Sequence, residues 1–207
     1  MFTFFYTPNT CSLASHIVLE EAQASYEAKR VDFSKDEQRS AAYLDINPKG
    51  RVPALVTPRG VLTETPAVLV FIAQSFPAAK LAPLDDAFLF AELQSFNSYM
   101  CSTVHVAHAH RVRGNRWVDD AGAIAAMQKK VPETMAACFD LIETKMLRGP
   151  WVMGETYSIA DPYLFTIAGW LESDSVDIAG FPRVHDHFMR MRERPAVQRA
   201  LAMTAAA

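Results

Sequence analysis

The sequence has few cysteines and no long apolar run. Three cysteines in 207 residues are an odd number and cannot form a disulfide framework, so a reducing compartment is expected, where each thiol is either buried or reactive. The longest uninterrupted apolar stretch, Ala67–Ala73, is far too short to span a membrane. The first residues, Met1–Tyr6, lack the basic region that opens a signal peptide. A cytoplasmic protein without a membrane partner is therefore expected.

An excess of charge of one sign is also missing. The 20 Lys and Arg nearly balance the 23 Asp and Glu. The net charge of −3 does not predict electrostatic binding to nucleic acid or to an anionic membrane. There is no glycine-rich phosphate loop, no serine elbow and no HExxH motif. In contrast, 50% of the residues are hydrophobic and 11% are aromatic, which suffices for a buried core and excludes intrinsic disorder.

Apolar patterning predicts a small α/β domain over residues 1–77. The predicted strands are Phe2–Tyr6, Tyr26–Asp32, Ala54–Thr57 and Val61–Thr63, the last two forming a hairpin. The predicted helices are Ser12–Ala22 and Ala67–Gln74. Thr65 is expected to cap the second of these helices, with Pro66 at its first helical position.

The rest of the sequence predicts an all-helical domain over residues 84–207, joined to the first domain by a proline-containing linker at 76–83. The segment 84–112 has no proline or glycine, and 124–141 carries an apolar stripe with Pro132 as a kink or a break. Further helices are expected around 164–171, 182–193 and 196–202.

Cys11 stands where the first strand and a proline-containing turn give way to the predicted helix Ser12–Ala22. A helix N-terminus has unpaired N–H groups and a partial positive charge, which lower the pKa of a cysteine thiol placed there. The segment CSLA has no second cysteine at the resolving position, which argues against a thioredoxin-type dithiol cycle. Two interpretations stay open at this point, a reactive thiol and a small buried side chain at a tight turn.

Two more features lie in the same domain. Val52-Pro53 follows the turn Asn47–Gly50 and enters a strand. A cis bond there would turn the Val52 backbone outward to pair with an extended peptide ligand, whereas a trans bond would be an ordinary strand start. Glu64 and Thr65 precede a helix, where a carboxylate and a hydroxyl suit a ligand with an α-ammonium beside an α-carboxylate. Plain capping accounts equally well for Thr65.

The order and spacing of these motifs resemble one family. The segment Tyr6–Ile17 (YTPNTCSLASHI) resembles the N-terminal segment of bacterial beta-class glutathione S-transferases, and Asn47–Leu55 (NPKGRVPAL) resembles the cis-proline turn of that family. Leu62–Thr65 (LTET) is similar to its Glu-Ser/Thr glutathione motif, and Tyr157–Asp161 (YSIAD) to its buried capping box. The resemblance runs from the first strand to the last helices.

The resemblance implies a thioredoxin-like N-terminal domain, an all-helical C-terminal domain and a homodimer. It implies a detoxifying transferase that conjugates its co-substrate glutathione to small electrophilic hydrophobic compounds. Cys11 and His105 take the positions of catalytic residues, Cys11 lying close to the glutathione sulfur and able to form a mixed disulfide with it. The residues implied to bind glutathione are Tyr6, Lys35, Arg51, Val52, Pro53, Glu64 and Thr65.

Two positions depart from the family pattern. Val106 stands where relatives often carry a basic residue, and Ser98 where an asparagine is common. These departures leave two alternatives open: a glutathione-dependent thioltransferase or peroxidase in which Cys11 itself turns over, and a non-catalytic binding protein of the same fold. Trp117 and Trp170 are expected as walls of the electrophile site.

No metal is expected in this protein. His105 and His108 could share a helix face, but His110 points elsewhere, and no carboxylate or cysteine stands at a helpful spacing. Cys101 and Cys138 lie within helical patterns and are predicted to fill the core.

Overall fold

The computed structural model of the protein describes residues 1–205; residues 206 and 207, the end of the predicted helical domain, lie outside the described part. The chain forms two compact units. The first unit consists of residues 1–91 together with 191–207, and the second consists of residues 92–190. None of the helices in the described part is long and apolar enough to cross a membrane.

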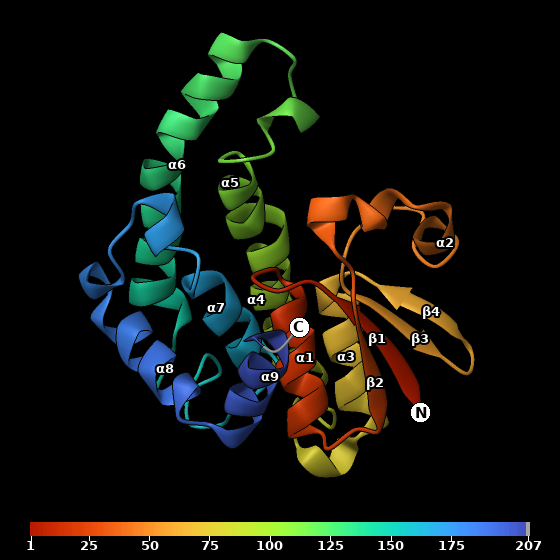
Figure 1. Cartoon of the computed structure of the whole chain (residues 1–207). Coiled ribbons are helices and arrows are strands. Elements are labelled where there is room, and N and C mark those ends of the chain that lie inside the picture. The colour runs from red at the N-terminus through yellow and green to blue at the C-terminus, as the bar shows by residue number, and fades with distance from the viewer. Residues whose placement is uncertain (206–207) are drawn as a thin grey trace. The chain divides into compact units, whose positions relative to one another are not determined.

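A four-stranded sheet is the centre of the first unit (Figure 1). Its strands are β1 (Phe2–Tyr6), β2 (Tyr26–Arg30), β3 (Ala54–Thr57) and β4 (Gly60–Thr63), in the spatial order β2-β1-β3-β4. β1 pairs with β2 in parallel and with β3 in antiparallel fashion, and β3 and β4 form the predicted hairpin. The predicted strands are confirmed, and this arrangement with its helices is the thioredoxin-like fold that the resemblance implied.

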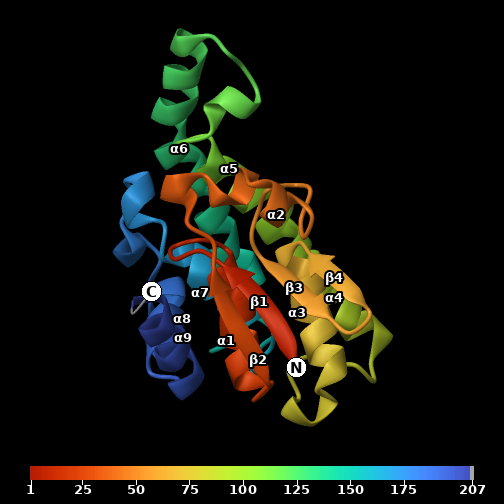
Figure 2. The ribbon, with the colours of Figure 1, turned by 45° about the vertical axis from the view of Figure 1, so that its right-hand side comes forward.

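Four helices belong wholly to the first unit, and Figure 2 shows them around the sheet from a second side. They are α1 (Ser12–Glu21), α2 (Ala41–Leu44), α3 (Thr65–Ser75) and α9 (Pro195–Ala205). Because side chains alternate along a strand, β1 meets different helices on its two faces. The ring of Phe4 lies 5.4 Å from that of His16 on α1, and the ring of Phe5 lies 5.7 Å from that of Tyr43 on α2. Helix α2 was not predicted from the sequence.

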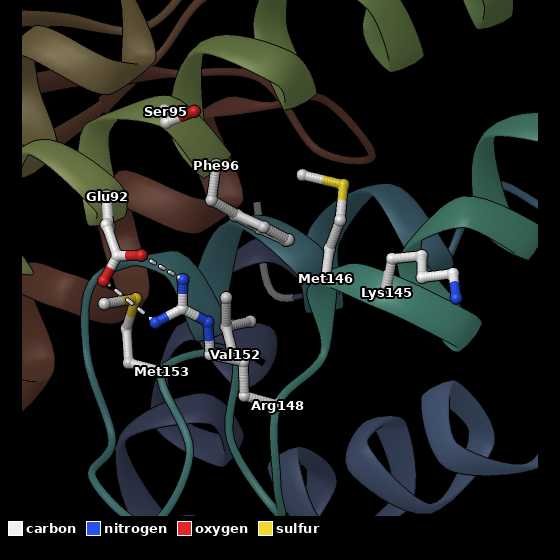
Figure 3. Close-up of a pocket in the computed structure, with 8 residues that line it drawn as sticks. All are labelled: Glu92, Ser95, Phe96, Lys145, Met146, Arg148, Val152 and Met153. Carbon is white, nitrogen blue, oxygen red and sulfur yellow. Dashed lines mark hydrogen bonds and ion pairs between the residues drawn. The ribbon is translucent and has the colours of Figure 1, made fainter.

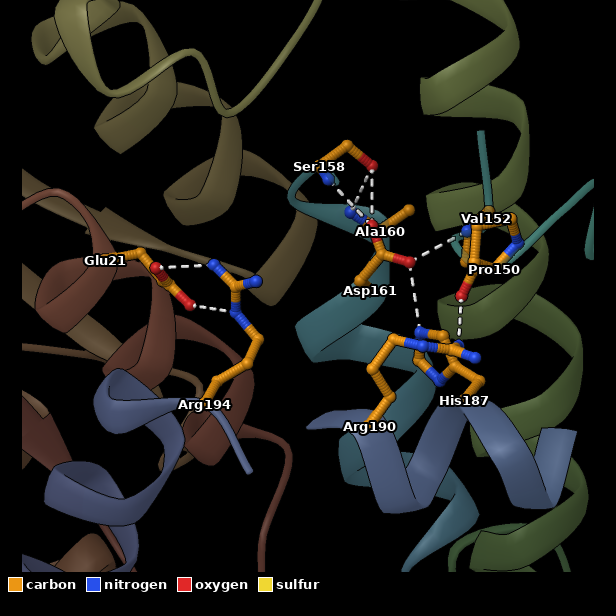
Figure 4. Close-up of polar contacts among 9 residues, drawn as sticks. All are labelled: Glu21, Pro150, Val152, Ser158, Ala160, Asp161, His187, Arg190 and Arg194. Atoms are coloured by element: carbon orange, nitrogen blue, oxygen red, sulfur yellow. Dashed lines mark hydrogen bonds and ion pairs between the residues drawn. The ribbon is translucent and has the colours of Figure 1, made fainter. Parts of the chain in front are cut away.

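The last helix of the chain, α9, packs on α1 within the first unit. Two ion pairs support this contact. The Arg194 guanidinium lies 2.6 and 3.0 Å from the two carboxylate oxygens of Glu21 (Figure 4). The guanidinium of Arg199, on α9, lies 2.6 Å from a carboxylate oxygen of Glu20. The C-terminal segment thus returns to the α/β unit.

The start of α3 differs from the prediction. Glu64, not Thr65, is the capping residue, and it makes no side-chain capping hydrogen bond. Thr65 is the first helical residue and Pro66 the second, a position that proline tolerates because the first N–H groups of a helix have no partner within it. After α3, the predicted linker contains a short 3₁₀ turn, Pro77–Ala79, and a buried Leu81.

The second unit is helical, as predicted. Its helices are α4 (Ala87–Tyr99), whose first turn belongs to the first unit, α5 (His105–Ala109), α6 (Ala121–Leu141), α7 (Ala160–Ala168) and most of α8 (Pro182–Arg192). Within the segment 84–112, which has no proline or glycine, a π turn, Met100–Val104, separates α4 from α5. Pro132 lies inside α6 without breaking it.

Asp161 organises the core of the second unit (Figure 4). Its carboxylate is fully buried and accepts hydrogen bonds from Ser158 N at 2.7 Å, Val152 N at 2.8 Å and His187 Nε2 at 3.0 Å. The bond from Ser158 N is the acidic half of the predicted capping box. Every residue of α7, where this carboxylate lies, is buried. One charged group therefore fixes the start of α7, the segment at Val152 and helix α8.

Candidate functional site

Cys11 caps helix α1 and lies beside Val52. The turn before it is tied by hydroxyl groups: Thr10 Oγ1 donates to the carbonyl oxygen of Thr7 at 2.8 Å and lies 2.7 Å from Ser12 Oγ. The partly exposed thiol of Cys11 donates to the carbonyl oxygen of Val52 at 3.5 Å. The helix N-terminus places a partial positive charge next to this sulfur. The structure thus brings together two residues that lie far apart in the sequence.

The segment before Val52 is held rigidly. The carbonyl oxygen of Arg51 accepts hydrogen bonds from Asn47 Nδ2 at 2.6 Å and from the Tyr43 hydroxyl at 2.7 Å. Burial raises the pKa of Tyr43 to about 12, so its hydroxyl stays a donor at neutral pH. Gly50 has φ +59°, and a Cβ there would lie 3.0 Å from a backbone oxygen, so only glycine is accommodated without strain.

The bond between Val52 and Pro53 is cis. Val52 is largely buried, in a cluster with Val31 and Tyr43. Its backbone N–H donates none of the hydrogen bonds found within residues 1–205. An extended peptide ligand therefore has a backbone donor to pair with at this position.

Glu64 holds an unusual backbone conformation at the start of α3, with φ +72° and ψ +121°. A residue other than glycine pays about 1–3 kcal/mol for such dihedral angles, which occur most often at functional sites. The Glu64 carboxylate lies 2.5 Å from Lys49 Nζ, which also donates to Thr63 Oγ1 at 2.6 Å. Next to it, Thr65 is buried at the N-terminal end of the helix. An anionic group of a ligand is stabilised at such an end.

The contact of Lys49 with Glu64 in the candidate site was not predicted from the sequence. It lies in the Asn47–Gly50 turn, but nothing in the sequence links it to Glu64, which is 15 residues further on. The pairing arises because β3 and β4 fold back on each other and bring Thr63 and Glu64 to the same turn.

The remaining predicted glutathione ligands lie in different surroundings. Tyr6 is 4% exposed, and its ring packs 5.4 Å from that of His16 in the core, so the structure does not bring its side chain to a surface. Lys35 lies in a 3₁₀ turn, with its side chain 74% exposed and Nζ 3.4 Å from the Asp32 carboxylate. The side chain of Arg51 is exposed.

His105, in the second unit, is the first residue of α5 after the π turn. Its ring lies edge-on to Trp170, with the ring centres 5.0 Å apart. His108, one turn further along α5, stacks on the same indole at 4.4 Å. The two tryptophans predicted to line the electrophile site differ in their exposure. Trp170 is buried in this stack, while Trp117 is 48% exposed and lies against His110.

The two departures from the family pattern are both accessible. Val106 is partly exposed, and Ser98 is exposed on α4, where its carbonyl oxygen accepts from Ser102 Oγ at 2.8 Å. The residue before it, Asn97, is fully buried, and neither amide atom has a hydrogen-bond partner among the described residues. The helix thus carries an asparagine one position before the expected one.

The other two cysteines differ from each other. Cys138 is buried as predicted, and burial raises the pKa of its thiol. The prediction that Cys101 fills the core is wrong, since it is only partly buried on the π turn, where it donates to the carbonyl oxygen of Ser98. Within residues 1–205, no group of three or more metal-ligating side chains is found.

A cavity of about 150 Å³ lies in the second unit (Figure 3). It is lined by Glu92, Ser95, Phe96, Lys145, Met146, Arg148, Val152 and Met153. Glu92 and Arg148 form a two-point ion pair at its edge, with distances of 2.9 and 2.5 Å. Glu92 and Arg148 therefore satisfy each other's charge, and none of the predicted site residues lines the cavity.

Comparison with known proteins shows the family to which this chain belongs. Glutathione S-transferase GstA of Escherichia coli O157:H7 is 32% identical over 202 residues, which cover 96% of each chain. The chain belongs to the glutathione S-transferase family. Models of the glutathione S-transferase N-terminal and C-terminal domains match residues 1–74 and 107–195.

Solved structures agree with this family assignment. A glutathione transferase homologue from Sulfitobacter, with bound glutathione, is 45% identical, with a TM-score of 0.95 and 98% of each chain covered. The bacterial beta-class glutathione S-transferase of Sphingomonas chungbukensis is 30% identical, with a TM-score of 0.85, covering 99% of this chain and all of that one. The resemblance to bacterial transferases and the fold that it implied are confirmed.

Proposed function

We propose that this chain binds glutathione on its α/β unit and conjugates the glutathione thiolate to small, hydrophobic electrophiles. Residues 1–77 would hold glutathione, and residues 84–207 would line the electrophile site. The observation that carries the proposal is the set of backbone and cap positions of the first unit: Cys11 at the start of α1 beside Val52, and Glu64 with Thr65 at the start of α3.

Each part of glutathione has a matching partner in this set. The free N–H of Val52, next to Pro53, would pair with the cysteinyl backbone. The Glu64 carboxylate would pair with the α-ammonium group of the γ-glutamyl end. The N-terminal end of the helix at Thr65 would bind the α-carboxylate of the same γ-glutamyl end. Arg51 and Lys35 are exposed cations that would meet the glycine carboxylate.

Glutathione reacts as a thiolate, so the site has to lower the pKa of its thiol. The dipole of α1 and the Cys11 side chain would stabilise the sulfur anion, and His105 would supply a second polar group. A decrease of about two pKa units would stabilise the thiolate by roughly 2.7 kcal/mol. Electrophile binding would use the apolar face near Trp170.

A second candidate function follows from the exposure of Cys11. Its thiol is partly accessible at a helix N-terminus, so a mixed disulfide between Cys11 and glutathione could carry the turnover in a thioltransferase or peroxidase reaction. Disulfide reduction faster than conjugation, together with glutathionylated Cys11, would favour this alternative over conjugation.

A homodimer is part of the proposal. Phe88 is 72% exposed, and Leu84 and Leu89 beside it are each 40% exposed, which is a large apolar surface for a free chain. We also infer a cytoplasmic location, because three cysteines in 207 residues give no disulfide framework and suit a reducing compartment.

Retention on immobilised glutathione, followed by conjugation of chlorodinitrobenzene, tests the proposal. We expect the chain to be retained, to be eluted by free glutathione and to form the conjugate. No binding at millimolar glutathione would reject both catalytic candidates. Binding without conjugation or disulfide reduction would leave a binding protein of the same fold.

A further inference from the structure

The second unit has another cavity, of about 520 Å³, which is larger than the one in Figure 3. It lies between the end of α7, the turns that follow this helix, and helix α8. Four apolar side chains line it: Leu171, Val176, Ile178 and Phe188. The ring of Phe188 is stacked on that of Phe165, with the ring centres 4.7 Å apart, which fixes its orientation. A cavity of this size with an apolar wall suits a small organic molecule.

The turn after α7 has two sides, and the cavity lies on only one of them. The N–H of Asp174 donates to the carbonyl oxygen of Trp170 at 3.1 Å, so these two residues share one side of a helical turn. Trp170 stacks on His108, and the Asp174 carboxylate lies 2.8 Å from Nδ1 of the same histidine. Leu171 and Ser175, each one position further along the chain, line the cavity instead. No described residue of α5 lines it, so the cavity is separate from the histidine face of that helix.

The rim of the cavity carries two carboxylates. Glu172 and Asp177 both line it, and both residues are exposed. The Glu172 carboxylate takes part in none of the hydrogen bonds or ion pairs found within residues 1–205. The Asp177 carboxylate accepts from Ala179 N at 2.9 Å with one oxygen, which leaves the second oxygen to a ligand. Among the described residues that line the cavity, none is a lysine, an arginine or a histidine.

The C-terminal end of α7 adds to the negative potential of the cavity. Ala168, the last residue of the helix, and Gly169, which caps it, both line the cavity. The last carbonyl groups of a helix carry a partial negative charge. Arg111 contacts the same turn, but it donates to the carbonyl oxygen of Ser173 at 2.6 Å and lies 3.9 Å from the Asp174 carboxylate, outside the cavity. A hollow lined by charges of one sign attracts a ligand of the opposite sign, here a cation.

We propose that this cavity is a binding site for organic cations with an apolar body, the class to which quaternary ammonium and phosphonium compounds belong. The apolar body lies against Leu171, Val176 and Phe188, and the positive charge lies at Glu172 and Asp177. The partly exposed ring of Phe188 adds a cation–π contact to such a ligand. An apolar anion of the same size has the same apolar contact but is repelled by the two carboxylates.

Calorimetric titration of the full chain with tetraphenylphosphonium and with tetraphenylborate tests the preference for positive charge. The two ions have nearly the same size and shape and opposite charges, so apolar contact alone predicts equal affinities. We expect the phosphonium ion to bind at least about tenfold more tightly than the borate ion. Equal affinities, tighter binding of the borate ion, or no binding of the phosphonium ion would overturn the proposal.

A double variant, Glu172→Gln with Asp177→Asn, removes both charges and keeps the size of the side chains. The amide oxygen at position 177 still accepts from Ala179 N, so the turn keeps its capping bond. We expect the phosphonium ion to bind about tenfold more weakly to this variant, while the affinity for the borate ion does not fall. Glu155→Gln, an exposed carboxylate of the same unit that does not line the cavity, is the matched control and should leave both affinities unchanged.

A second variant, Gly169→Leu, fills the cavity without changing its charge. Gly169 has φ −63°, which any residue adopts, and a Cβ there would lie 3.8 Å from the ring of Phe188. This variant should weaken the binding of the phosphonium ion at least about tenfold. Should it fail to fold, as circular dichroism would show, the double variant decides. Phosphonium binding that is unchanged in the folded variants would place the cation elsewhere on the chain and overturn the proposal.

This inference does not depend on the proposed glutathione transfer. Every residue that lines the cavity lies in the second unit, and none of them is a predicted glutathione ligand. Wild-type chain that binds glutathione but not the phosphonium ion would reject the cation site alone. Wild-type chain that binds the phosphonium ion with the expected preference but does not bind glutathione would reject the proposed function and support the cation site.

Discussion

The two units of the chain hold their functional groups in different ways. In the first unit the groups stand at the ends of helices: Cys11 caps α1 and Glu64 caps α3. In the second unit the groups around His105 come from distant segments of the chain. Trp170 and Asp174, which contact histidines of α5, lie far from that helix in the sequence. A site that depends on local backbone geometry leaves short motifs in a sequence, while a site assembled by packing of distant side chains does not.

The largest expected effect is on the second unit, which depends on one buried carboxylate. Asp161→Ala would leave the N–H groups of Val152 and Ser158 and the ring of His187 without their acceptor. We expect the free energy of unfolding to fall by about 3–5 kcal/mol in urea denaturation. The matched control is Asp140→Ala on the exposed side of α6, which should change it by less than about 0.5 kcal/mol. A loss below about 1 kcal/mol for Asp161→Ala would contradict this role.

The first unit has its own buried ionisable group, in the core behind the site. His16 is fully buried, its ring nitrogens have no hydrogen-bond partner among the described residues, and burial lowers its pKa from 6.5 to about 4. The unfolded chain therefore binds an additional proton between these two values, so stability is fully present above pH 6.5 and is lost as the pH falls towards 4. The loss would reach about 3 kcal/mol.

Unfolding free energies measured at several pH values, for the wild type and for His16→Leu, check this prediction. The variant should lose much less stability than the wild type between pH 6.5 and 4. Identical acid slopes in the two proteins would show that His16 is not the group responsible.

The catalytic groups are expected to have intermediate effects. Cys11→Ala and His105→Ala would each remove one proposed polar partner of the glutathione sulfur and should lower kcat/KM for chlorodinitrobenzene about tenfold, as expected for one charge-assisted hydrogen bond. Cys101→Ala, a partly buried thiol on the π turn, serves as the control and should leave the rate unchanged. Unchanged rates in both site variants would reject the two proposed roles while leaving the fold intact.

The smallest effect is expected at the exposed ion pair of the first unit. The side chains of Lys49 and Glu64 are 43% and 58% exposed, so water and salt screen their attraction. Lys49→Met should change the free energy of unfolding by less than about 1 kcal/mol. A loss above about 2 kcal/mol would mean that this ion pair supports the fold in the way that Asp161 supports the helical unit.

The sequence predicted the first unit better than the second for a physical reason. All four strands follow from alternation, turns and a proline, which act locally. The errors occurred where tertiary packing decides: Lys49 meets Glu64 only through a hairpin, and the π turn before His105 has no signal in the sequence. Tyr6 belongs to the quoted motif, but the alternation of β1 turns it into the core.

The contact between Asp174 and His108 shows the same limit more strongly. This carboxylate lies 66 residues after His108, and its partner cannot be read from the sequence around either residue. By contrast, the acidic half of the capping box at Ser158 and Asp161 spans three residues, and it could be recognised before the structure was known. The span of a contact in sequence, rather than its importance, separates what could be predicted from what could not.

Calorimetric titration of glutathione into the wild type and into Glu64→Gln tests the central claim, that the cap positions of the α/β unit bind glutathione. The variant keeps the shape of the side chain but loses the charge that would meet the α-ammonium, and Glu27→Gln, on the exposed strand β2, is the matched control. We predict binding to the wild type and the control below millimolar glutathione, and affinity about tenfold weaker in Glu64→Gln. Equal affinity in all three proteins, or no binding to the wild type, would contradict the account.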